Sequence, residues 1–217
     1  MDLNESVVGE FAGPTTGADR AVLLAPSAGA DRDAPVLVAV AQALAEIGIP
    51  SLRFDYPYRL AGRRAPDRPM VLTAVTRSAA AELSERVGLP PDRLVVGGRS
   101  MGGRYASMLV ADAHDPLPAL GLLLLSYPLH PAGLPEKIRD AHFGSIKVPV
   151  LCLSGTRDAL APRPALELAV KKITGPTTIH WLETADHSYR PLKRSGITVE
   201  DVITEVAHTA AQWVADC

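Results

Sequence analysis

The chain has 217 residues, of which 47% are hydrophobic and 21% are charged, and its formal net charge is −2. This length and composition predict a single globular domain over residues 1–217, and the small net charge excludes broad electrostatic attraction to nucleic acid or to an anionic membrane. Its two cysteines, Cys152 and Cys217, are too few for a disulfide framework or a cysteine metal site, so no metal or other cofactor is expected.

The first segment, MDLNESVVGEFAG at residues 1–13, lacks the basic and long apolar regions of a signal peptide. No stretch of the chain approaches the roughly 18 consecutive apolar residues that a membrane span requires. The sequence therefore predicts a cytoplasmic protein that has no membrane partner.

Six short apolar runs alternate with helical patterns along the chain. Each run is about the length of a β-strand, and the six lie at residues 21–27, 51–57, 93–98, 120–128, 149–155 and 177–183. Four of them are apolar enough to be buried on both faces, as parallel strands between two layers of helices are. The last run, TTIHWLE, is more mixed and is typical of an edge strand.

Three helices with recognisable ends lie between or after these runs. The first is expected over residues 34–47 with Asp33 as its N-cap, and the second over residues 70–87 with Gly88 at its end. The last begins at a capping box that starts with Thr198. Because strands alternate with helices, we expect an α/β fold with a mainly parallel sheet of about six to seven strands and helices on both faces.

A glycine-rich turn at residues 97–103 follows the third run and precedes a helical segment. Its glycine spacing fits neither a P-loop nor a dinucleotide-binding fingerprint. What remains is a G-x-S-x-G pattern from Gly98 to Gly102, with Ser100 at the break between strand and helix. Such a turn projects the serine hydroxyl off the sheet as a nucleophile. The alternative is a structural turn in which glycine supplies a positive φ.

A serine nucleophile needs a base, and the base needs an acid that orients it. When the nucleophilic serine lies on a turn of this kind, the acid follows it in the chain and the histidine comes last, each directly after a strand. Asp158 follows the fifth run and His187 follows the sixth, so these are the expected acid and base. His130 is the alternative base. Asp186 is the alternative acid, although its carboxylate would have to turn back toward the ring of the next residue.

Backbone N–H groups must stabilise the oxyanion that forms when the serine attacks. The first donor is expected from Met101, which directly follows the nucleophile. The second is expected from the loop at residues 26–30, where Ala28 is the first choice and Ser27 the second.

Six segments together carry a resemblance to a known family. They are APSAGADRDAP, LRFDYPYRLAGRRAPDRP, GGRSMGGRYAS, LLSYPLHPAGLPEKIRD, LSGTRDAL and WLETADHSYRP, and they extend over about residues 20–191. The chain thereby resembles the compact, capless α/β-hydrolases related to dienelactone hydrolases, a family that also includes eukaryotic members of chromatin-modifying complexes. The resemblance implies the α/β-hydrolase fold, a triad of Ser100, Asp158 and His187, and hydrolysis of an ester-like bond.

This chain departs from the family in one place. Where the family usually has His-Gly, this chain has Pro26-Ser27, and proline has no backbone N–H to donate. The departure favours an alternative function, that of a non-catalytic interaction module with the same fold. The complete triad favours an enzyme.

Substrate binding is indicated less directly. The connection between the fourth and fifth runs is too short for a helical lid, so we expect an open site without a lid domain. The candidate substrate-binding residues are Arg63, Arg64, Arg99 and His130. The arginines are candidates because a guanidinium binds carboxylate or phosphate through two parallel hydrogen bonds. Alternatively, they are solvated or paired with Asp55 and Asp67. We expect a serine hydrolase whose partner is a small ester or lactone.

Overall fold

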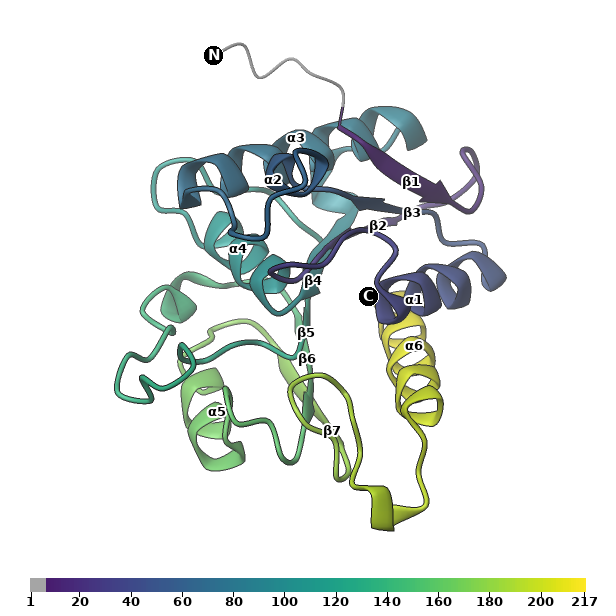
Figure 1. The fold of residues 1–217 in the computed structure, drawn as a ribbon. Helices are drawn as coiled ribbons and strands as arrows, with labels where there is room; N and C mark the ends of the chain where they lie inside the picture. Colours follow the sequence, from purple (N-terminus) through teal and green to yellow (C-terminus); the bar gives the residue numbers. More distant parts are fainter. Residues whose placement is uncertain (1–6) are drawn as a thin grey trace.

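In the computed structural model, which describes residues 7–217, seven strands form one sheet in the order β1-β3-β2-β4-β5-β6-β7 (Figure 1). The strands are β1 (Gly9–Ala12), β2 (Ala21–Ala25), β3 (Ser51–Phe54), β4 (Leu94–Arg99), β5 (Gly121–Leu125), β6 (Val150–Gly155) and β7 (Thr177–Leu182). All neighbouring strands from β3 to β7 are parallel. Residues 1–6, part of the segment in which no signal peptide was recognised, lie outside the described residues.

Each of the six apolar runs forms a strand, and β7 lies at an edge of the sheet as its mixed sequence predicted. Strand β1 was not predicted from the sequence; it pairs antiparallel with β3 from Gly9 opposite Phe54 to Ala12 opposite Ser51. Its four residues are partly buried or exposed and show no apolar run. Strand β1 is therefore defined by its pairing with β3 rather than by a local pattern.

Six helices connect or follow the strands: α1 (Pro35–Glu46), α2 (Pro57–Leu60), α3 (Pro69–Val87), α4 (Met101–Val110), α5 (Arg163–Val170) and α6 (Val199–Asp216). Helix α3 ends at Gly88, which has a left-handed φ of 67°, and α6 begins with the capping box predicted at Thr198. The N-cap of α1 is Ala34 and not Asp33. The Asp33 carboxylate instead forms an ion pair with the Arg53 guanidinium at 3.1 Å.

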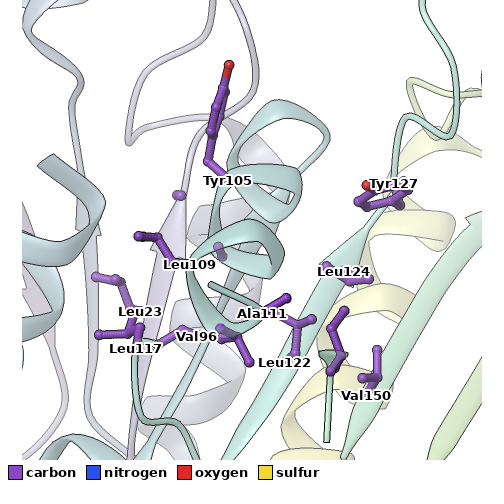
Figure 2. Close-up of a cluster of buried hydrophobic side chains, with 14 of the residues drawn as sticks. Leu23, Val96, Tyr105, Leu109, Ala111, Leu117, Leu122, Leu124, Tyr127 and Val150 are labelled. Atoms are coloured by element: carbon purple, nitrogen blue, oxygen red, sulfur yellow. The ribbon is translucent and has the colours of Figure 1, made fainter. Parts of the chain in front are cut away.

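The helices cover both faces of the sheet, with α3, α4 and α5 on one face and α1 and α6 on the other (Figure 1). Figure 2 shows part of the core between the sheet and α4, where Leu23 and Val96 of the sheet lie near Leu109 of α4. Each fully buried side chain of this kind contributes about 1.5–3 kcal/mol. This packing holds α4 against the sheet and so fixes the turn from which it starts.

The parallel strands bring their carboxyl ends to one edge of the sheet. Ser100 follows β4, Asp158 follows β6 and His187 follows β7, so all three come to that edge. The connection from β5 to β6 contains only a short 3₁₀ turn, at Phe143–Ser145, and no helical lid. Among the helices of residues 7–217, none is both long enough and apolar enough to cross a membrane.

Candidate active site

Ser100 lies in a tight turn between β4 and α4 and has a φ of 49° and a ψ of −109°. A positive φ is rare for residues other than glycine and marks a constrained position. The turn is held by a 2.8 Å hydrogen bond from the Ser100 N–H to the Leu125 carbonyl oxygen. A Cβ at Gly98 or Gly102 would overlap the Ala25 carbonyl oxygen of the neighbouring strand. Both glycines of the G-x-S-x-G pattern are therefore required by close backbone packing.

Three side chains form a continuous chain of hydrogen bonds at this edge of the sheet. The Ser100 hydroxyl lies 2.9 Å from His187 Nε2, and His187 Nδ1 lies 2.8 Å from Asp158 Oδ2. The second Asp158 oxygen accepts the Leu160 N–H at 2.8 Å. The Asp158 side chain is 0% exposed and that of His187 is 21% exposed. A buried carboxylate thus orients a histidine that reaches the serine, which is the geometry of a nucleophile, a base and an orienting acid.

The structure separates these residues from the alternatives that the sequence left open. Asp186 accepts the backbone N–H groups of Ser188 and Arg190 through its Oδ1, so its carboxylate shapes the turn after β7. The His130 ring lies 2.9 Å from the Pro131 carbonyl oxygen through Nδ1 and forms no hydrogen bond with Ser100. Neither alternative joins the hydrogen-bonded chain.

Two backbone N–H groups near Ser100 are available to an oxyanion. Within residues 7–217, the N–H groups of Ala28 and Met101 have no hydrogen-bond acceptor. The neighbouring Gly29 N–H donates to the Tyr58 hydroxyl at 3.0 Å, which anchors the loop that carries Ala28. Met101 opens α4, whose N-terminus favours negative charge. Pro26 precedes both donors, so its missing N–H removes neither of them.

A cavity of about 350 Å³ opens beside the nucleophile. It is lined by Ala28, Pro66, Ser100, Met101, Arg104, Tyr105, Pro128, His130, Pro131, Ala132, Arg139 and Leu160. The cavity therefore brings together the serine, both candidate oxyanion donors and His130. The short β5–β6 connection supplies much of its wall, although it forms no lid.

The three arginines expected to bind substrate do not line this cavity. Arg63 is exposed and forms an ion pair with Asp67 at 2.6 Å. Arg64 is also exposed, and its side chain forms no hydrogen bond or ion pair within residues 7–217. Arg99 donates to the His187 carbonyl oxygen at 2.8 Å and therefore holds the histidine loop. Their guanidinium groups are thus used elsewhere or lie in solvent, and substrate binding by these arginines stays a prediction.

Two other arginines, which the sequence analysis missed, line the cavity instead. Arg104 follows Ser100 by four residues on α4, so helical periodicity places both on one face of the helix. Arg139 comes from the irregular β5–β6 connection, where no periodic pattern could have indicated its position.

Metal-binding side chains do not gather at this site. Within residues 7–217, no group of three His, Cys, Asp or Glu side chains is arranged to hold a metal ion. The polar groups at the site are those of the hydrogen-bonded chain, the two N–H donors, the two arginines, His130 and Tyr105.

Comparisons with known proteins identify the family and the fold. A family model described as an alpha/beta hydrolase domain matches residues 18–215. Three solved structures are similar in fold. Dienelactone hydrolase from Anabaena variabilis is 20% identical, with a TM-score of 0.70 over 96% of this chain and 90% of that chain. Est1E from Butyrivibrio proteoclasticus, with ferulic acid bound, is 15% identical, with a TM-score of 0.73 over 96% of each chain. The propionate-bound esterase Est2 from Thermogutta terrifontis is 17% identical, with a TM-score of 0.69 over 96% of this chain and 88% of that chain.

Proposed function

Because the chain belongs to the α/β-hydrolase domain family, we propose that it is a serine hydrolase that cleaves a small carboxylic ester or lactone. Ser100 is the nucleophile, His187 the base and Asp158 the orienting acid. The observation that carries the proposal is the unbroken chain of hydrogen bonds from the buried Asp158 carboxylate to the Ser100 hydroxyl. The similarity in fold to a dienelactone hydrolase and to two esterases supports hydrolase activity.

In the first half of the reaction, Ser100 Oγ attacks the carbonyl carbon of the ester while its proton passes to His187 Nε2. The resulting oxyanion accepts hydrogen bonds from the N–H groups of Ala28 and Met101. When the bond between the carbonyl carbon and the alcohol oxygen breaks, His187 returns the proton to that oxygen. The products of this half are the free alcohol and an acyl group bound to Ser100.

In the second half, a water molecule takes the place of the alcohol. His187 removes a proton from the water as the water oxygen attacks the acyl carbon. The bond to Ser100 Oγ then breaks and His187 returns the proton to that oxygen. Asp158 remains ionised throughout and stabilises the imidazolium in both halves. The net reaction consumes one ester and one water and releases one carboxylic acid and one alcohol.

The alternative function, a non-catalytic module of this fold, makes the opposite prediction in one experiment. A fluorophosphonate probe reacts quickly only with a serine that a base activates. We expect rapid labelling of the wild-type protein, no labelling of Ser100→Ala, and strongly slowed labelling of His187→Ala. Ser107→Ala is the matched control, because Ser107 lies on the same helix but is buried. An unlabelled wild-type protein would favour the non-catalytic module.

A further inference from the structure

The cavity beside Ser100 carries positive charge that no acidic side chain balances. Its lining includes Arg104 and Arg139 and no acidic residue, and both arginines also line a neighbouring cavity that includes Asp112. Neither arginine forms an ion pair within residues 7–217. Elsewhere in the molecule, ion pairs with carboxylates are formed by Arg20, Arg32, Arg53, Arg59, Arg63, Arg77 and Arg163. Other arginines of the described chain also form no ion pair, but Arg104 and Arg139 share the cavity of the nucleophile, where an anionic ligand would pair with them.

Arg104 is positioned by the helix that starts at the nucleophile. Its backbone N–H donates to the Ser100 carbonyl oxygen at 3.0 Å, so the two residues lie one turn apart. Four residues of helix span about 6 Å along the axis, and helical side chains lean toward the N-terminus. Arg104 Nε is buried and has no hydrogen-bond partner within the described chain. Nε of Arg53 and of Arg59 is also buried without a partner, so it is the position of Arg104 beside Ser100 and the cavity that points to a ligand.

Arg139 is held by its own backbone in the β5–β6 connection. Its N–H donates to the Leu129 carbonyl oxygen at 2.7 Å, and its carbonyl oxygen accepts the Tyr127 hydroxyl at 2.6 Å. Burial, and then the positive charge of Arg104, lower the pKa of Arg139. Two like charges on one cavity wall repel each other, and an anion bound between them removes this repulsion.

The position of His187 shows which part of an ester would enter the cavity. His187 does not line the cavity, whereas Ser100 and Met101 do. The alcohol oxygen must lie next to His187 Nε2 to receive its proton, so the alcohol part extends toward His187. The acyl part is then the part that occupies the cavity with the arginines.

From this arrangement we infer that the acyl part carries a carboxylate bound by Arg104 and Arg139, and that the substrate is the half-ester of a short dicarboxylic acid. The inference rests on the proposed esterase function and adds the substrate class to it. The spacer between the two carbonyl groups is short, because a single helical turn separates Ser100 from Arg104 and the whole cavity measures about 350 Å³.

The test compares a charged acyl group with a neutral one of the same shape. The substrates are the monoethyl esters of succinic, glutaric and adipic acids, each paired with the ethyl ester whose free carboxylate is replaced by a primary amide. Ethanol release gives kcat/KM for each compound. A charge-assisted bidentate contact predicts a preference of about 10- to 150-fold for the carboxylate in the best-fitting pair.

The arginine variants assign this preference to the proposed residues. The ratio of kcat/KM for the carboxylate to that for the amide is measured in Arg104→Met, Arg139→Met and Arg93→Met. We expect the ratio to fall toward one in the first two and to stay at the wild-type value in Arg93→Met. Arg93 is the matched control because it is exposed and directly precedes β4, at the opposite end of that strand from Ser100. The melting temperature of each variant shows that it is folded.

The outcomes separate this inference from the proposed function. If the wild type hydrolyses both esters of every pair equally, or if neither cavity arginine alters the preference, the inference is wrong while the esterase function stands. If no ester is hydrolysed, the proposed function fails, and glutarate binding to Ser100→Ala, measured by calorimetry, decides the carboxylate site by itself. If glutarate binds to Ser100→Ala and the added substitution Arg104→Met abolishes this binding, the carboxylate site is supported. If glutarate does not bind detectably to Ser100→Ala, the carboxylate site is refuted.

Discussion

Replacing Asp158 with asparagine tests how the carboxylate acts on His187. Both Asp158 oxygens accept hydrogen bonds, Oδ1 from the Leu160 N–H and Oδ2 from His187 Nδ1, each at 2.8 Å. Asparagine has only one side-chain oxygen. Because the Leu160 N–H is a fixed backbone donor, the amide oxygen would stay with it and the NH₂ group would face His187.

That amide orientation changes which ring nitrogen carries the proton. Nδ1 must then accept from the asparagine NH₂, so the proton moves to Nε2, and Nε2 can no longer take the Ser100 proton. In a Ser-His-Asp triad of known mechanism, the same change lowers kcat about 10⁴-fold. At about 1.36 kcal/mol for each tenfold change, this corresponds to a rise in the activation barrier of about 5.5 kcal/mol.

The assay is kcat for a short-chain ethyl ester, measured with the rate of fluorophosphonate labelling. Both should fall by a similar factor in Asp158→Asn. The melting temperature should change little, because the asparagine oxygen keeps the hydrogen bond to Leu160. Asp186→Asn is the matched control, since its carboxylate bonds only to backbone N–H groups of a turn. An Asp158→Asn protein that keeps kcat within tenfold of wild type would refute the proposed role of Asp158.

Three further predictions concern the residues around the site. Arg99→Met should lower kcat up to about 10- to 100-fold with little change in KM, and Arg99→Lys should restore part of it, because Arg99 donates to the His187 carbonyl oxygen. Gly98→Ala should lower the free energy of unfolding in urea by at least about 3 kcal/mol, because its Cβ overlaps the neighbouring strand. Gly133→Ala, with a positive φ but no nearby atom, should cost only about 1–2 kcal/mol. Burial, and then the charge of Arg104, lower the pKa of His142 from 6.5 to about 4. Between pH 6.5 and pH 4 the unfolded chain therefore binds more protons at this residue than the folded protein does. The melting temperature should accordingly fall as the pH drops from 6.5 to 4. His142→Gln should show a smaller fall, and an equal fall in both proteins would contradict the assignment.

The arrangement of strands and helices could be predicted in large part because each element has a local signal. Runs such as 120–128 are apolar on both faces, which only strands buried between two layers of helices require. The capping box at Thr198 likewise lies within one helical turn of chain. Strand β1 had no such signal, because its stability comes from pairing with β3. Ala34 replaced Asp33 as the N-cap of α1 because Asp33 is paired with Arg53, a residue that is distant in the sequence.

The candidate site divides in the same way. Chain order and the parallel sheet predicted that Ser100, Asp158 and His187 would meet at one edge, and the structure places them within hydrogen-bonding distance. Their catalytic roles stay proposals that the experiments above test. For the arginines, their positions in the chain indicated that positive charge is present near the site but not which arginines line the cavity.

The sequence by itself determined six of the seven strands, the glycine-rich turn at the serine, and the sheet edge at which the polar residues collect. These properties depend on residue spacing and on backbone conformations that only certain residues adopt, which are local along the chain. Only the tertiary structure decided that Arg104 and Arg139 share a cavity with Ser100 while Arg99 is turned toward the histidine loop. The physical reason is that a long charged side chain takes its direction from whichever carboxylate, carbonyl or cavity lies within reach, and those partners come from distant segments that meet only after the sheet has formed.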